Sequence, residues 1–258
     1  MDMALTVDDI MRALLERRVT LFYQPVICAK TKEIDHFEAL LRLVDEVGGI
    51  ITPNRFIKTA EDNNLIHHLD RRVLDIAAVT LSVRDNIRLA VNISAATLKN
   101  DVAAHDYLLK LKALGPQAAQ IMIELTETID PGDLAGVNAF AAAARGMGCR
   151  FAIDDFGAGH SSFKSLMAAE ADEIKIDGSF ARGIATTSYK QSFVRLIVDM
   201  AQTFDIKTVA ECVDNVADAE MLTEFGVDFL QGYLFSKPTA EPDWPLSRPQ
   251  RIPLSEVG

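Results

Sequence analysis

Short apolar runs alternate along the chain with longer segments in which apolar residues recur every three or four positions. The short runs are typical of buried strands, and the longer ones of helices that bury one face. We expect strands over Thr20–Ala29, Ile34–Leu43, Leu89–Ile93, Gln120–Leu125, Arg150–Ile153, Glu173–Ile176, Lys207–Ala210 and Phe229–Leu230. We expect helices over Pro53–Asp62, Leu69–Val83, Val102–Leu114, Asp133–Met147, Ser162–Ala168, Tyr189–Phe204 and Ala217–Phe225, and an N-terminal helix over residues 1–18.

Eight strands, most of them followed by a helix, are typical of a (β/α)8 barrel. The turn at Lys30–Lys32 is too short for a helical crossover, so the first two strands should be antiparallel. We therefore predict an α/β fold, a TIM-like barrel with an antiparallel first strand, formed by one domain over residues 1–258. The segment 241–258, rich in proline and arginine, is expected to be a loose tail.

The composition of the chain argues against several classes of protein. The formal net charge of −11 argues against a general basic surface for DNA or RNA. The three cysteines are odd in number and form no CxxC pair, which argues against a disulfide framework and a zinc site. No apolar run approaches the ~18 residues that span a bilayer, and the acidic, amphipathic N-terminus is unlike a signal peptide. We expect a cytoplasmic domain without membrane contact.

Acidic and amide side chains gather at the carboxyl ends of the predicted strands, which meet at one mouth of such a barrel. They are Glu38, Asn92, Glu124, Glu127, Asp154, Asp155, Asp177, Glu211 and Gln231, with Lys175 among them. So many carboxylates cannot all be ionised in one place unless cations lie between them. Oxygen ligands without paired histidine or cysteine select Mg²⁺, Mn²⁺ or Ca²⁺. The adjacent Asp154 and Asp155, in RFAIDDFGAGHSS, predict a seat for two metal ions, which suits phosphoester hydrolysis.

Each of these residues also has a structural interpretation. A single acid at a strand end is more often a helix cap or an ion-pair partner, and Asp133, after Pro131–Gly132, is expected to be such a cap. Asn92 could be an ordinary turn residue. Lys175 is harder to explain structurally, because a lysine inside an apolar strand needs a partner, which the acidic cluster would supply.

Nine motifs follow one another between Phe22 and Pro238: YQPV, EALLR, GGIITPNRFIKTAE, VNIS, ELTE, DDFGAGHSS, KID, AE and QGYLFSKP. In this order and spacing they resemble the EAL family of bacterial cyclic di-GMP phosphodiesterases. The resemblance implies a TIM-like barrel that hydrolyses one phosphodiester of cyclic di-GMP to give linear pGpG. It implies two Mg²⁺ or Mn²⁺ ions per site, a homodimer, and regulatory domains if the chain is part of a longer protein. Ca²⁺, which is larger, should inhibit.

The resemblance also implies residue roles. Ligands of one metal would be Glu38, Asn92, Glu124 and Asp154. The second metal would be bound by the bridging Asp154 with Asp155 and, directly or through water, by Glu211. Lys175 would act in catalysis with Glu211 and Asp155, orienting the attacking water or steadying charge on the phosphate. Asp177 would support Lys175, and Glu127 would brace the DDFG loop. Substrate contacts would be Gln24, Arg42, Gln231 and Pro238.

The chain departs from the family pattern beside these positions. His160 stands where tyrosine is common, Cys212 where glycine is common, Asp214 for glutamate and Leu43 for tryptophan. None of the implied metal ligands is missing. Two alternatives to an active phosphodiesterase stay open. One is a receptor that holds the dinucleotide without cutting it, and the other is a competent output domain that is switched off until a sensor or a dimer partner acts on it.

Overall fold

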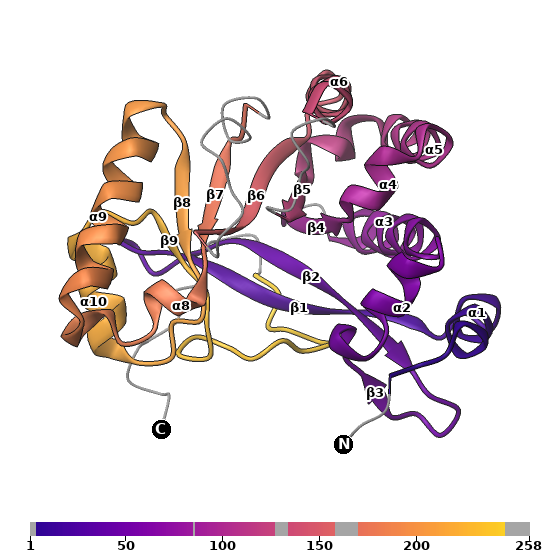
Figure 1. The fold of residues 1–258 in the computed structure, drawn as a ribbon, viewed down its shortest axis with the longest axis horizontal. Helices are drawn as coiled ribbons and strands as arrows, with labels where there is room; N and C mark the ends of the chain where they lie inside the picture. The colour runs from indigo at the N-terminus through magenta and orange to yellow at the C-terminus, as the bar shows by residue number, and fades with distance from the viewer. Residues whose placement is uncertain (1–3, 85, 127–133, 158–169, 246–258) are drawn as a thin grey trace.

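The computed structural model describes residues 4–84, 86–126, 134–157 and 170–245. Eight strands close into a barrel (Figure 1). They are β1 (Val19–Cys28), β2 (Ile34–Val44), β4 (Leu89–Ile93), β5 (Ile121–Thr126), β6 (Arg150–Phe156), β7 (Glu173–Ile176), β8 (Lys207–Ala210) and β9 (Phe229–Leu230). A short strand, β3 (Ile50–Ile51), pairs only with β2 in the described part of the sheet.

Strand β1 runs antiparallel to both of its neighbours, β2 and β9, whereas β2 and β4 through β9 pair in parallel. The reversal follows from the tight turn after β1, in which Lys32 takes a left-handed backbone conformation with φ of 61°. The β1–β2 register places Gln24 opposite Glu38. The predicted TIM-like α/β barrel with an antiparallel first strand is thus confirmed.

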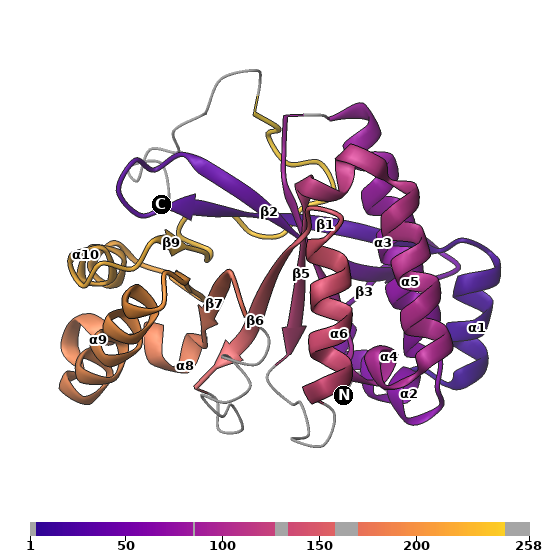
Figure 2. The ribbon, with the colours of Figure 1, turned by 90° about the horizontal axis from the view of Figure 1, so that it is seen from above.

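Helices pack around the outside of the strands (Figure 2). They are α1 (Val7–Leu15), α2 (Ile57–Asp62), α3 (Ile66–Val83), α4 (Ala95–Lys99), α5 (Asp101–Ala113), α6 (Leu134–Arg145), α8 (Gly178–Ala181), α9 (Ser188–Thr203) and α10 (Val216–Glu224). Single 3-10 turns are η1 (Pro53–Arg55), η2 (Gly115–Gln120) and η4 (Ile184–Thr186). Within the described ranges, no helix combines the length and apolar character needed to cross a membrane.

The expected elements differ from the observed ones mainly in length. The short elements β3, α4 and α8 were not predicted, and the N-terminal helix is shorter than residues 1–18. The expected helix Pro53–Asp62 is divided into η1 and α2 at Phe56, whose φ of −141° breaks the helix. The expected helix Ser162–Ala168 and the expected cap Asp133 lie outside the described residues.

The first residues of the expected loose tail are packed against the barrel. The Trp244 ring lies 4.9 Å from the Tyr23 ring and 5.0 Å from the Phe37 ring, measured between centroids. The Arg84 guanidinium lies over the same indole at 5.0 Å. Residues 241–245 therefore cover β1 and β2, and the expectation of a loose end was wrong for this part of the tail.

Candidate active site

Strand alternation brings the predicted site residues to the inner face of the barrel. Ala90, Met122 and Ala152 form a small buried cluster on β4, β5 and β6. Two residues later, the same face of each strand presents Asn92, Glu124 and Asp154, because side chains alternate with a period of two. The apolar cluster thus lies one layer below these polar groups inside the barrel.

Lys175 lies at the centre of the mouth. It is 1% exposed, and its Nζ lies within ion-pair distance of four carboxylates. The distances are 3.3 Å to Glu38 Oε2, 3.1 Å to Glu124 Oε2, 3.0 Å to Asp154 Oδ1 and 2.9 Å to Glu211 Oε1. The prediction that an acidic cluster partners the buried lysine is confirmed.

Burial and mutual repulsion govern the acids of the mouth. Burial raises the pKa of Glu124 well above its usual value and that of Glu211 to about 8, although Lys175 opposes both shifts. Burial acts in the same direction on Glu38, but Lys175 and the amides bonded to Glu38 outweigh it and lower its pKa. Burial alone would lower the pKa of Lys175, yet the four carboxylates raise it well above the usual value. One ammonium therefore does not suffice to keep all of these acids ionised.

The carboxylates fall into two groups that suit hard cations. Oxygen atoms of Glu38, Glu124 and Asp154 lie within 4.8 Å of one another, and so do oxygen atoms of Asp154, Asp155 and Glu211. Among the described residues, the buried Glu124 Oε1 has no hydrogen-bond partner, and Asp154 Oδ1 has an ion pair with Lys175 but no hydrogen bond. Unpaired buried carboxylate oxygens are costly unless a cation binds them. The two groups of oxygen donors therefore fit hard divalent cations.

Asn92 joins this cluster through Glu38. Its Nδ2 donates a hydrogen bond to Glu38 Oε1 at 2.9 Å, and β-sheet register pairs it with Glu124. Asn92 therefore lies within strand β4, not in a turn, and its side-chain amide is oriented by Glu38. The interpretation of Asn92 as an ordinary turn residue was therefore wrong.

Comparison with known proteins agrees with this geometry. Residues 7–238 match the EAL domain. The chain belongs to the EAL domain family. Its relatives include the cyclic di-GMP phosphodiesterase PdeR of Escherichia coli, 35% identical over 238 residues, which are 89% of this chain and 35% of PdeR. The cyclic di-GMP phosphodiesterase NbdA of Pseudomonas aeruginosa is 31% identical over 236 residues, 90% of this chain and 30% of NbdA. This EAL domain thus spans about a third of the length of these relatives.

A solved structure has the same fold. The PaMucR phosphodiesterase in its c-di-GMP complex is 32% identical to this EAL domain and superposes with a TM-score of 0.81. The match covers 90% of this chain and 96% of that chain. The similarity therefore extends through the barrel and the elements that carry the carboxylates.

The residues expected to contact substrate lie beside the metal-ligand cluster of the EAL domain. Gln231 Nε2 donates to Glu38 Oε2 at 2.6 Å and to Gln24 Oε1 at 3.3 Å, and Gln24 Nε2 donates to the Ser236 carbonyl at 3.0 Å. Gln231 Oε1 is buried and has no hydrogen-bond partner in the part of the chain that the structure describes. Arg42 is half-buried, and its guanidinium lies over the Phe22 ring at 5.5 Å. Pro238 is half-buried on the segment that follows β9.

Two other implied roles are not seen in the structure. The Asp177 carboxylate accepts a hydrogen bond from the Ser179 backbone N–H at 3.0 Å and caps α8. Among the contacts that the described residues make, Asp177 has none with Lys175, so the expected direct support is not found. Glu127 and His160 lie outside the described residues.

A left-handed backbone conformation occurs near the end of β6 and in the loop after β8. Asp155 has φ of 56° and Cys212 has φ of 55°, in the left-handed region that favours glycine. Cys212 stands where the family commonly has glycine, and this φ gives the physical reason. A Cβ on Gly178 would meet Cys212 Sγ at 2.6 Å, so glycine at 178 leaves room for the thiol.

Sequence reasoning missed a carboxylate pair behind the mouth. Asp70, on α3, is buried and accepts hydrogen bonds from the Ser94 backbone N–H at 3.0 Å and from Thr97 Oγ1 at 2.5 Å. Glu61 accepts one from Ser94 Oγ at 2.9 Å. A cavity of about 300 Å³ adjoins both acids as well as Glu38, Asn92 and Asp154. Burial raises the pKa of Asp70 to about 7, against its two hydrogen bonds. The sequence signal that could have indicated Asp70 is its position as an acid on the apolar stripe of α3.

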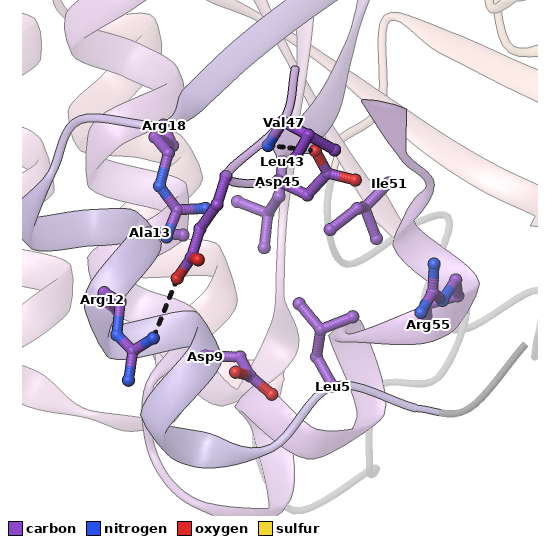
Figure 3. A pocket seen from close by; sticks show the side chains of 11 residues that line it. Leu5, Asp9, Arg12, Ala13, Arg18, Leu43, Asp45, Val47, Ile51 and Arg55 are labelled. Atoms are coloured by element: carbon purple, nitrogen blue, oxygen red, sulfur yellow. Dashed lines mark hydrogen bonds and ion pairs between the residues drawn. The ribbon is translucent and has the colours of Figure 1, made fainter. Parts of the chain in front are cut away.

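A second cavity, of about 380 Å³, lies between α1 and the β2–β3 hairpin (Figure 3). We call it the α1 groove. It is lined by the arginines Arg12, Arg18 and Arg55 and by the acids Asp9, Asp45 and Glu46. Arg12 Nη1 pairs with Glu46 Oε1 at 2.9 Å, and both side chains are exposed. Its positive and negative charges are equal in number, so the groove lacks the charge excess of the mouth.

Proposed function

We propose that this EAL domain, a single domain over the chain, hydrolyses one phosphodiester of cyclic di-GMP to give linear pGpG with the help of two divalent cations. The observation that carries the proposal is the set of carboxylates around one buried lysine at the mouth. The relatives PdeR and NbdA, which are named cyclic di-GMP phosphodiesterases, support the choice of substrate.

One cation would be held by Glu38, Asn92, Glu124 and Asp154, and the other by Asp154, Asp155 and Glu211. Mg²⁺ or Mn²⁺ bound there would activate the attacking water and neutralise the phosphate. Ca²⁺ prefers longer and looser coordination, so it should inhibit. Mutual repulsion among the acids supports this assignment, because divalent cations would relieve it.

Lys175 would act as a cation rather than as a base. Four carboxylates raise its pKa well above the usual value, so it stays protonated near neutral pH. A protonated lysine can orient the attacking water by donating to it, or steady negative charge that develops on the phosphate. Asp155 and Glu211, on the second cation's side, would complete the catalytic set.

The substrate would lie over Gln24, Gln231, Arg42 and Pro238. The planar guanidinium of Arg42 suits the second phosphate of the dinucleotide. Gln231 Oε1, which is buried and has no partner within the described ranges, would offer an acceptor to a donor on the substrate. A homodimer, attached regulatory domains and a cytoplasmic location are further proposals, which the family resemblance supports.

A receptor that binds cyclic di-GMP without cutting it is the second candidate. Cys212 favours it, because a side chain in a left-handed backbone conformation follows directly after Glu211. Such a residue could displace Glu211 from the second cation. Every expected metal ligand is nevertheless present, which favours the active enzyme.

Turnover separates the two candidates. The chain is incubated with cyclic di-GMP and Mn²⁺ or Mg²⁺, with EDTA and Ca²⁺ as controls, and the nucleotides are separated by chromatography. Metal-dependent pGpG is the expected result. Calorimetric binding of cyclic di-GMP without any product would overturn the enzyme assignment and favour the receptor.

A further inference from the structure

The end of strand β4 is held from outside the barrel by two carboxylates. Strand β4 ends at Ile93, and Ser94 caps α4, its Oγ accepting from the Ala96 N–H at 3.2 Å. Asp70 accepts from the Ser94 backbone N–H, and Glu61 from the Ser94 hydroxyl. One residue at the strand end is therefore bonded through both its backbone and its side chain.

The two acids lie on different helices, and their side chains differ in solvent exposure. Asp70, on α3, is 6% exposed and also accepts from Thr97 Oγ1, which joins the first turn of α4 to the same carboxylate. Glu61, on α2, is exposed. Two helices packed outside the barrel thus fix the position and the direction of the β4–α4 junction.

Asn92 precedes this junction by two residues. Its side chain is directed into the mouth, where Nδ2 donates to Glu38 Oε1. The lining of the cavity of about 300 Å³ includes Asp70, Glu61 and Ser94 as well as Glu38, Asn92 and Asp154. The acids that hold the junction and the expected metal ligands therefore line the same space.

We propose that Asp70 and Glu61 are positioning residues that hold Ser94 so that Asn92 presents its side-chain oxygen to the cation shared with Glu38. Neither acid contacts the reacting atoms, and both act through Ser94. This inference rests on the proposed function only as far as the metal site. Partners that orient metal ligands typically change metal affinity by 10–100-fold when removed.

The test measures Mn²⁺ affinity of the full chain from the electron paramagnetic resonance signal of free Mn²⁺, without substrate. We expect Asp70→Ala, which removes the acceptor of the Ser94 N–H, to weaken binding at the tighter site about tenfold. Asp75→Ala is the matched control, since Asp75 lies on the same helix and pairs with Lys110 instead. It should leave Mn²⁺ affinity unchanged.

A double-mutant cycle separates positioning from general damage. If Asp70 acts through Asn92, then Asp70→Ala should have no further effect on Mn²⁺ affinity in the Asn92→Ala background. An equal loss in both backgrounds, or wild-type affinity in Asp70→Ala, would overturn the inference.

The exposed Glu61 provides a test that does not depend on the fold tolerating a change at Asp70. Glu61→Ala should weaken Mn²⁺ binding by a few-fold, and Glu61→Gln, whose amide oxygen still accepts from Ser94, should restore it. Equal affinities for these two variants would contradict the role of Glu61. Failure of the wild-type chain to bind Mn²⁺ would instead overturn the proposed function and, with it, this inference.

Discussion

The cavity beside the barrel mouth and the α1 groove have similar volumes, about 300 Å³ and 380 Å³, but the mouth and the groove differ in their balance of charge. In the groove, three arginines face three acids, and the Arg12–Glu46 pair is exposed to solvent (Figure 3). At the mouth, four carboxylates contact one lysine that is almost completely buried, and Asp155 adds a fifth acid. A charge excess that is buried, rather than the size of a cavity, therefore marks the candidate active site.

The largest expected effect comes from removing a carboxylate of the mouth. Glu38→Ala should abolish turnover of cyclic di-GMP, because it removes an expected metal ligand and the partner of Asn92. The rate of pGpG formation measures the effect. Glu46→Ala, an acid of the groove, is the matched control and should keep wild-type turnover. Near wild-type activity in Glu38→Ala would contradict the assignment of the mouth.

Removing the central cation should have the next largest effect. Lys175→Ala should lower kcat by about 100–1,000-fold, since a preorganised charge that acts in the transition state is lost. KM should change by no more than about threefold, because the ground-state contacts belong to other residues. Steady-state kinetics measure both. A raised KM with unchanged kcat would make Lys175 a substrate clamp instead.

Metal should stabilise the mouth and leave the groove unaffected. A ligand that binds only the folded state at 100 times its Kd adds about 2.7 kcal/mol of stability per site. Adding Mn²⁺ to the EDTA-treated chain should therefore raise the Tm by several degrees in the wild type and in Glu46→Ala. Scanning calorimetry of Glu38→Ala should show a much smaller shift. Equal shifts in all three proteins would place Mn²⁺ binding elsewhere.

Proton binding should also distinguish the buried acids near the mouth. Burial raises the pKa of Asp70 from its ordinary 3.8 to about 7. The folded state then binds the proton more tightly than the unfolded state does, so the free energy of unfolding should fall between about pH 4 and pH 7 and level off above. The contribution is on the order of a few kcal/mol.

Asp70→Asn should lack this part of the pH dependence. Urea unfolding in EDTA at pH 5 and pH 8 measures it for both proteins. The same difference between the two pH values in wild type and variant would show that Asp70 does not carry this proton.

The smallest effect is expected in the groove. Arg12→Ala breaks the exposed pair with Glu46, and exposed pairs gain little because solvent screens them. Turnover should stay within about twofold of wild type, and the Tm should barely change. A large loss of activity would show that the balanced groove takes part in function and would break the comparison.

The barrel and the centre of the site could be predicted because they follow from local pattern. A two-residue alternation directs Asn92, Glu124 and Asp154 to one face, and the short turn after β1 fixes the antiparallel start. A lysine in the apolar run EIKID required acidic partners, and the structure supplies four.

The remaining features depend on contacts between distant segments. The hold of Asp70 on Ser94 joins residues 24 positions apart, and the packing of Trp244 on Tyr23 joins the two ends of the chain. Only one local signal pointed to the first, since Asp70 lies on the apolar stripe of Leu69, Val73 and Leu74. The left-handed conformation of Cys212 could not be predicted from its residue type, because cysteine does not favour a positive φ.

Counting bound Mn²⁺ tests the central claim most directly, because it asks whether the buried charge excess of the mouth is a seat for two cations. The free Mn²⁺ signal is titrated against the wild type, Asp154→Ala and the groove variant Glu46→Ala. The account predicts two ions per chain in the wild type and in Glu46→Ala, and a loss of both sites in Asp154→Ala, whose carboxylate would be shared. Two ions bound equally by all three proteins, or none bound by the wild type, would contradict it.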